Sequence, residues 1–304
     1  MRKVYIDFMG NRKWLFAVSL VFIAVSIGAL LIRGLNFGIE FKGGTTIVLP
    51  YKQGLTVESV RAELSKDGMT DAIVQPVQQG TTLDGFLVRS SISDTAKANQ
   101  VFQTAATNLK LDLSGTSASI IAPSYSKTIT DAAMLALVLS LAAILVYISI
   151  RFEYKMSVTA VIALVHDALI TLGIYALMGR EVTPNTIAAL LTILGYSLYD
   201  TIVVFHRIRE NTAHLVKKSF MEMANDSINQ VLARWINTGL SSIIPVVVLL
   251  LFGGTTLKDF AFALTIGLIS GAYSSVAVAS PLYAMWKETE PRYQALKKKY
   301  AKAS

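Results

Sequence analysis

Six apolar stretches, each about as long as a bilayer-crossing helix, decide what this chain can fold into. A helix needs about 20 apolar residues to cross the hydrocarbon core of a membrane. The stretches cover residues 14–32, 132–150, 156–179, 182–205, 235–257 and 260–286. Residues 33–131 separate the first stretch from the second, and the other four follow closely. We therefore predict a membrane all-α bundle of six transmembrane helices, arranged as one plus five.

Composition agrees with a membrane protein and excludes several kinds of site. The chain is 53% hydrophobic and 16% charged, whereas soluble domains carry roughly a quarter charged residues. It has no cysteine, which excludes disulfides, thiolate metal sites and cysteine nucleophiles. Its three histidines are widely spaced, and no phosphate-binding P-loop motif occurs. We therefore expect no metal, no cofactor and no enzymatic role.

The lysines and arginines of the short loops predict the orientation. Seventeen lie on the side of the two termini, and two, Arg180 and Lys258, lie on the other. Because cytoplasmic loops carry an excess of Lys and Arg, both termini are expected in the cytoplasm. The net charge of +8 therefore reflects basic residues in the cytoplasmic loops and does not indicate nucleic-acid binding. The expected segments are a cytoplasmic N-terminus (1–13), a first transmembrane helix (14–32), an extracytoplasmic domain (33–130), a five-helix transmembrane domain (131–286) and a basic cytoplasmic tail (287–304).

The extracytoplasmic segment alternates between strand and helix patterns. We expect Thr56 and Asp94 to be helix N-caps, and Gln79-Gly80 and Asp84-Gly85 to form turns. The order β-α-β-β-α-β is typical of ferredoxin-like domains, so we predict a small α+β domain. We expect this domain to have a binding or structural role rather than a catalytic one. The predicted strands cover residues 45–50, 72–77, 85–89 and 118–122, and the predicted helices cover 57–66 and 94–109.

Asp200 is the foremost functional candidate, because an ionisable residue at membrane depth is costly and is usually functional. Helical periodicity places it in one polar stripe with Tyr196 and Ser197. Arg234 stands at the start of the next span, at a similar depth. One interpretation is a protonatable switch, in which movement of Arg234 changes the proton affinity of Asp200. The alternatives are a static ion pair that braces the bundle and a stripe that faces lipid.

Three further residues are supporting candidates. His166 and Asp167 lie near the middle of the third span. Because adjacent helix residues point about 100° apart, we expect these two not to pair directly. They would either join a proton relay or each form hydrogen bonds with a neighbouring helix, and the second, structural role is favoured. His206 lies at the cytoplasmic end of the fourth span and is expected to be interfacial.

Several motifs occur in a fixed order along nearly the whole chain, and together they resemble the SecF family. This family comprises the smaller membrane subunits of the bacterial SecD–SecF accessory complex of protein translocation, within the resistance-nodulation-division superfamily. The strongest motif is LGYSLYDTIVVF at residues 194–205, followed by RIREN at 207–211. The others are NFGIEFKGGT at 36–45, RFE at 151–153, ALVHD at 163–167, and SINQ at 227–230 with Arg234.

The resemblance implies a multi-pass protein of the bacterial inner membrane that uses the proton motive force to help draw preproteins outward. It implies that Asp200 carries the proton and that Arg234 is its basic partner. The implied partners are a SecD-type subunit, the SecYEG channel, the translocating preprotein and membrane lipid, with YajC as a further candidate. Carboxylates bind H⁺ and Na⁺ alike, so the coupling ion stays open. His206 departs from the family, which usually has an aspartate there.

Other functions are less compatible with the sequence. A proton-coupled small-molecule exporter would share the fold, but related drug exporters carry two homologous membrane halves in one chain, and this chain has one. A passive assembly scaffold would tolerate Asp200→Asn. A membrane protease is disfavoured, because a single aspartate cannot form an aspartic dyad. His206 also lies about 13 Å along the same helix from Ser197, too far for a serine–histidine pair.

Overall fold

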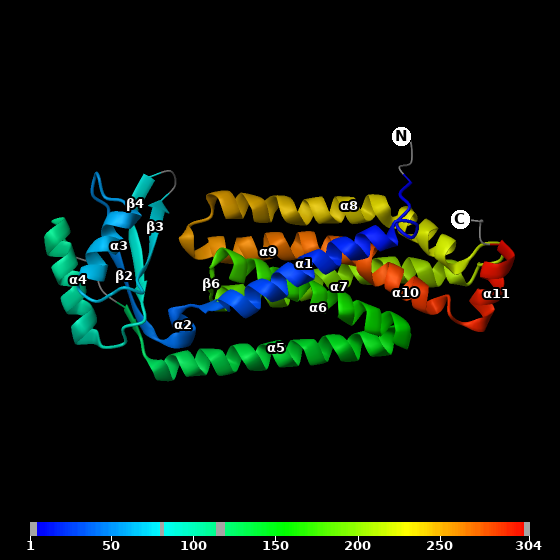
Figure 1. The fold of residues 1–304 in the computed structure, drawn as a ribbon, viewed down its shortest axis with the longest axis horizontal. Helices are drawn as coiled ribbons and strands as arrows, with labels where there is room; N and C mark the ends of the chain where they lie inside the picture. The colour runs from blue at the N-terminus through cyan, green and yellow to red at the C-terminus, as the bar shows by residue number, and fades with distance from the viewer. Residues whose placement is uncertain (1–4, 80–81, 114–118, 301–304) are drawn as a thin grey trace.

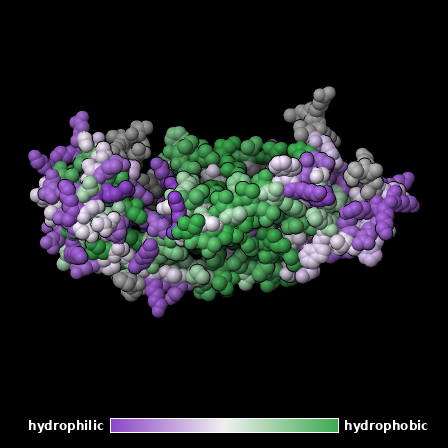
Figure 2. All heavy atoms as spheres, viewed as in Figure 1, coloured by the Kyte–Doolittle hydropathy of each residue, from purple (hydrophilic) through white to green (hydrophobic). Residues whose placement is uncertain are grey.

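The computed structural model describes residues 5–79, 82–113 and 119–300. Figure 1 shows a long helical bundle with a small domain at one end, which we call the head (residues 44–121). Both ends of the chain lie at the opposite end of the bundle, which we call the far end. Figure 2 shows hydrophobic side chains over the middle of the molecule and hydrophilic ones over the head and the far end. This banding is that of a membrane-spanning protein.

Six helical segments of the described chain are long and apolar enough to cross a membrane, which confirms the predicted number. The sixth crossing combines three consecutive elements. The first five are α1 (Arg12–Arg33), α5 (Pro123–Arg151), α6 (Tyr154–Met178), α7 (Pro184–Thr212) and α8 (Phe220–Phe252). The sixth consists of α9 (Thr255–Ser274), the π-helical turn η1 (Ser275–Ala279) and α10 (Ser280–Lys287), and α11 (Pro291–Tyr300) follows it.

Two features of these helices differ from the sequence prediction. The fifth helix begins at Phe220 rather than near residue 235, because Ser219 and Glu222 form a capping box that starts it earlier. Its first turns are polar, so hydropathy detects only the part inside the apolar band. The sixth crossing contains the unpredicted turn η1. Pro281 has no N–H to donate to the carbonyl four residues before it, and a wider π turn accommodates that missing bond.

The head contains the predicted succession of elements. Its sheet has the order β3-β4-β2-β5, with antiparallel neighbours throughout. The helices contribute Leu64 and Phe102 to a core that the sheet completes with Leu49, Val74 and Phe86. The elements are β2 (Gly44–Pro50), α3 (Val57–Lys66), β3 (Ile73–Gln79), β4 (Thr82–Ser90), α4 (Thr95–Leu109) and β5 (Ser119–Ile121).

The local signals of the head were predicted with one error. Thr56 caps α3 in a capping box with Ser59, and Asp94 caps α4 through the N–H groups of residues 96 and 97. The predicted turn at Asp84-Gly85 is wrong, because both residues lie inside β4, near a register shift between Val77 and Gln78. A Cβ on Gly85 would overlap the carbonyl oxygen of Leu49, so the strands approach closely there. Gly80 and Ala118, at two other predicted boundaries, lie outside the described residues.

The head is joined to the bundle by a short ladder and an ion pair. Strand β1 (Asn36–Phe37) pairs in parallel with β6 (Glu181–Val182), which connects α6 to α7. Helix α2 (Ile39–Lys42) follows β1 and contacts α5. Arg89 of β4 donates a hydrogen bond of 2.8 Å from Nη1 to Oε2 of Glu181, and both side chains are largely buried. Because β6 leads into α7, the head is linked directly to the helix that carries Asp200.

The ion pair between Arg89 of the head and Glu181 of the bundle predicts that the stability of the protein depends on pH. Burial raises the pKa of the Glu181 carboxyl above its ordinary value of 4.5, against the lowering effect of Arg89. A raised pKa in the folded state gives stability that is complete below the unfolded pKa and is lost as the pH rises through the folded pKa. We therefore expect Glu181→Gln to flatten the decline in melting temperature of the purified protein between about pH 4.5 and neutrality. Glu58→Gln, at an exposed position of α3, is the control. An unchanged slope in Glu181→Gln would contradict this assignment.

Candidate functional site

Asp200 lies at a point where α7 meets α8 and α9. Its half-buried side chain lines two small pockets between these helices. The first pocket also receives Tyr196 and Ser197, so the structure brings together the three residues of the predicted polar stripe. The rest of its lining is Thr238, Gly239 and Ser242 of α8 and Leu268, Gly271 and Ala272 of α9. Asp200 therefore lines a pocket to which several hydroxyl-bearing residues of α7 and α8 contribute.

Arg234 lines the second pocket together with Asp200. The prediction that the two residues lie at similar depths on adjacent helices is thereby met. In the described part of the chain no ion pair joins their side chains. The static ion pair that was the alternative interpretation is thus not formed. Arg234 and Asp200 thus line one pocket without forming an ion pair.

Part of this polar region lies on the surface of the bundle. Tyr196 is 46% exposed and Tyr199 is 52% exposed, and Arg234 is exposed as well. Ser197, which lines the same pocket as Tyr196, is buried. Polar and charged groups at membrane depth almost always face protein or water rather than lipid. The surface around Arg234 is therefore expected to face protein or water rather than lipid.

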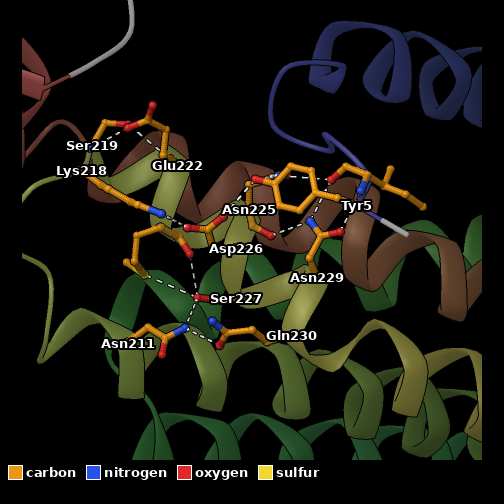
Figure 3. A network of polar contacts seen from close by, with 12 residues as sticks. Tyr5, Asn211, Lys218, Ser219, Glu222, Asn225, Asp226, Ser227, Asn229 and Gln230 are labelled. Atoms are coloured by element: carbon orange, nitrogen blue, oxygen red, sulfur yellow. Dashed lines mark hydrogen bonds and ion pairs between the residues drawn. The ribbon is translucent and has the colours of Figure 1, made fainter. Parts of the chain in front are cut away.

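Polar contacts at the far end join the end of α7 to the start of α8 (Figure 3). Gln230 of α8 accepts hydrogen bonds from Arg207 (2.5 Å) and Asn211 (2.9 Å) of α7. Asn211 also donates to Ser227 at 2.8 Å. Asn225 and Asn229 bind the backbone of the N-terminal segment at residues 6, 8 and 9. Asn225 and the SINQ motif thus hold the start of α8, upstream of Arg234, against α7 and the N-terminal segment.

Asp167 is fully buried at the centre of the bundle. Its Oδ2 accepts hydrogen bonds from Ser197 of α7 (2.6 Å) and Ser274 of α9 (2.8 Å), and its Oδ1 accepts from Ser270 of α9 (2.7 Å). The Nδ1 atom of His166 lies 3.0 Å from Oδ1. The prediction that His166 and Asp167 do not pair is therefore wrong. The 100° separation describes the directions of the Cβ atoms, and the longer imidazole turns back to reach the neighbouring carboxylate.

Ser270 and Ser274 were missed because the sixth span carries no charge. The sequence does hold a signal for them. Gly267 and Gly271 form a Gly-x-x-x-Gly pattern, which lets membrane helices approach closely. A Cβ at Gly267 would overlap Ile193, and one at Gly271 would press against Ser197. The two glycines thus bring α9 against α7, and serines at 270 and 274, on one face of α9, then reach Asp167.

This close approach gives a stability prediction with opposite signs at two glycines. Alanine normally stabilises a helix interior relative to glycine by roughly 0.5–1 kcal/mol. Gly271→Ala should instead destabilise the protein by about 1–3 kcal/mol, because the methyl group overpacks the contact with Ser197. Gly28→Ala in α1, where a Cβ meets open space, is the matched control. Unfolding in mixed micelles measures both, and equal effects of the two variants would argue against the tight α7–α9 contact.

His206 and the possibility of a metal site complete the inventory of candidates. His206 is exposed in the part of α7 near the far end, close enough to Glu210 to act on its carboxyl electrostatically. It lies apart from the pockets around Asp200. Within the described ranges no three His, Asp or Glu side chains come together in a way that could hold a metal ion. The site is thus one of carboxylates, hydroxyls and a guanidinium.

Comparisons with known proteins match most of the chain. The family model described as protein export membrane protein SecD/SecF, C-terminal, matches residues 101–289, and the SecD/SecF GG motif matches residues 28–54. The protein translocase subunit SecF of Streptomyces coelicolor is 38% identical, over 96% of this chain and 80% of that protein. The protein translocase subunit SecDF of Thermus thermophilus is 35% identical, over 96% of this chain and 40% of that protein.

A solved structure shows the same arrangement of helices. The crystal structure of SecDF, a translocon-associated membrane protein from Thermus thermophilus, superposes with a TM-score of 0.82 at 33% identity. The match covers 94% of this chain and 39% of the SecDF chain. The present chain therefore spans well under half of that longer protein.

Proposed function

Since this chain belongs to the SecD/SecF family of protein-export membrane proteins, we propose that it is an accessory subunit of the Sec export machinery. With a SecD-type partner it uses the proton motive force to promote the movement of preproteins across the bacterial inner membrane. The far end of the bundle, with the chain termini, lies in the cytoplasm, and the head is a ferredoxin-like domain on the outer side. The basic side chains gathered towards the far end support this orientation.

One observation carries the proposal. Asp200 and Arg234 line the same pocket on adjacent membrane helices, and no ion pair holds them. If Arg234 moved to within about 4 Å of ionised Asp200, the attraction between them would reach about 4 kcal/mol at an effective dielectric constant of about 20. Binding of a proton to Asp200 removes that attraction, and its release restores it. The relative position of α7 and α8 therefore depends on whether a cation occupies Asp200.

The contacts at the head end supply a route from this switch to the exported chain. Helix α7 begins directly after β6, whose Glu181 is bound by Arg89 of the head. A shift of α7 relative to the other helices would pull on β6, on its ladder with β1 and on the ion pair. The head then moves relative to the bundle, and this movement acts on a preprotein that is leaving the SecYEG channel. YajC is a further candidate partner.

The exposed polar face around Arg234 supports a partner with a second membrane bundle. In the Thermus relative the matching region is 40% of a longer SecDF chain, so SecD-type and SecF-type parts are joined there. In the present protein a separate SecD-type subunit would cover the exposed polar face around Arg234. Lipid then surrounds the remaining apolar surface of the bundle.

Purification of the chain from native membranes tests the partner. We expect a SecD-type protein to co-purify with the tagged chain, and Leu240→Arg on the exposed face of α8 to abolish that association. Leu139→Arg, on the exposed face of α5, controls for a charge placed in the membrane. Recovery of the chain alone, in a state that exports small molecules, would favour the exporter alternative. A complex that is equally active with Asp200→Asn would favour a passive scaffold.

A further inference from the structure

Asp167 has an environment that suits a carboxyl group able to gain and lose a proton. Four hydrogen-bond partners surround it, namely the hydroxyls of Ser197, Ser270 and Ser274 and the imidazole of His166. Its side chain is 0% exposed, and neither Lys nor Arg takes part in the cluster. A serine hydroxyl donates to an ionised carboxylate and, by rotating, accepts from a protonated one. The cluster can therefore satisfy both forms of Asp167, which a guanidinium partner could not.

Ser197 connects this cluster to the pocket of Asp200. Its hydroxyl donates to Asp167 at 2.6 Å, and the residue also lines the pocket that contains Asp200. The free volume of this pocket, about 10 Å³, is close to that of one water-sized sphere. Tyr196, Thr238 and Ser242 supply further hydroxyls around it. Ser270 and Ser274 bind Asp167 equally well but lie outside this pocket.

The two carboxyl groups lie at different depths. Asp167 is 11 residues from the head end of α6, which is about 17 Å along the helix. Asp200 is 16 residues from the head end of α7, or about 24 Å. In the orientation proposed above, a proton that enters from outside reaches the depth of Asp167 before that of Asp200. The order of the two groups thus matches the direction in which the proton motive force drives protons.

His166 adds a polar atom that the packing leaves without a partner. Its Nε2 is buried and has no hydrogen-bond partner in the described chain, whereas its Nδ1 is paired with Asp167. The ring stacks on Tyr273 of α9 and lines a groove together with Ser19 of α1. The ionisable groups around Asp167 are thus His166 on its own helix, Tyr273 on α9 and Asp200 on α7. Within the described chain this Nε2 atom is thus unpaired and able to accept a proton.

We propose that Asp167 is a second proton-binding site, which passes its proton to Asp200 through the hydroxyl of Ser197. Protonated Asp167 gives its proton to Ser197 Oγ, and the hydroxyl gives its own proton to a water molecule in the pocket. That water gives a proton to ionised Asp200. The step leaves Asp167 as a carboxylate, Ser197 and the water unchanged, and Asp200 as a carboxylic acid. This relay rests on the proposed function, because it supplies the proton that Asp200 binds.

Infrared difference spectroscopy tests proton binding directly, without an export assay. The purified chain with its SecD-type partner is titrated between acid and neutral pH, and the carbonyl stretch of protonated buried carboxyl groups is recorded. We expect a band that persists in Asp200→Asn and disappears in Asp167→Asn, while Asp131→Asn, exposed on α5, leaves it in place. A spectrum that lacks a band sensitive to Asp167→Asn would overturn the second site. The proposed role of Asp200 would stand, because its own band is lost only in Asp200→Asn.

A pair of serine variants tests the relay. Ser197→Ala and Ser274→Ala each remove one donor to the same oxygen of Asp167, but only Ser197 also lines the pocket of Asp200. In proteoliposomes under an imposed pH gradient, we expect Ser197→Ala to slow proton entry by about tenfold or more, the range of a lost proton-transfer group. Ser274→Ala, which leaves the lining of the Asp200 pocket intact, should slow proton entry clearly less than Ser197→Ala does. Equal effects of the two variants, with the Asp167 band retained in both, would show that Ser197 only braces the cluster.

Discussion

Export driven by the proton gradient will fall by at least about tenfold in cells whose chain carries Asp200→Asn, down to the level of cells that lack the chain. Asparagine keeps the size and polarity of the side chain but neither binds nor releases a proton at physiological pH. The pocket lined by Tyr196 and Ser197 would keep its shape, and the charge that attracts Arg234 would be permanently absent. The measurement is the rate at which a reporter preprotein reaches the outer side.

The matched control for this variant is Asp131→Asn. Asp131 lies in another membrane-crossing helix, α5, and is exposed outside both pockets, so its replacement should leave export unchanged. Immunoblots of the membrane fraction establish that each variant inserts to the same level. Normal export with inserted Asp200→Asn would remove the proton switch and leave only the membrane topology standing.

Arg234→Met should abolish gradient-driven export to the same extent. Methionine fills much of the volume of the arginine stem but has no charge to respond to Asp200. Arg234→Lys keeps the charge and should retain part of the activity. Because the two residues act as one unit, the double variant Asp200→Asn with Arg234→Met should be no worse than either single variant. The assay is the same reporter export, at equal membrane levels of each chain.

Arg209→Met is the control for the loss of an arginine. Arg209 is exposed near the far end of α7, where it donates to the carbonyl of Arg151 and lies over Phe152. We expect a small effect there, in the range of an exposed contact. Two single variants that each retain part of the export, and whose losses multiply in the double variant, would mean that Asp200 and Arg234 act independently.

The helices and most of the head could be predicted because their signals are local. An apolar stretch of membrane length is sufficient to define a crossing, since the bilayer admits few other structures. Thr56 and Asp94 were found because capping depends on a few adjacent residues. The error at the predicted turn arose because distant contacts decide there. Asp84-Gly85 continues a strand because the ladder with β2 holds it there.

The site was predicted in part, for a similar reason. Asp200 and Arg234 stand out as charges in apolar sequence, and the order of the helices sets their depth, so their shared pocket could be foreseen. The cluster around Asp167 could not be read in the same way. Its serines are uncharged, come from two other helices and depend on a contact that Gly271 permits. A hydropathy pattern treats such serines as ordinary polar residues of a membrane helix.

Proton entry into proteoliposomes that contain the chain and its SecD-type partner tests the central claim most directly. A pH gradient is imposed with the acidic side facing the head, with and without a preprotein in transit, and a parallel Na⁺ gradient distinguishes the coupling ion. We predict that the wild-type complex admits protons and moves the preprotein together, and that Asp200→Asn does neither. Equal proton entry and equal preprotein movement in the wild-type and Asp200→Asn complexes would contradict the account.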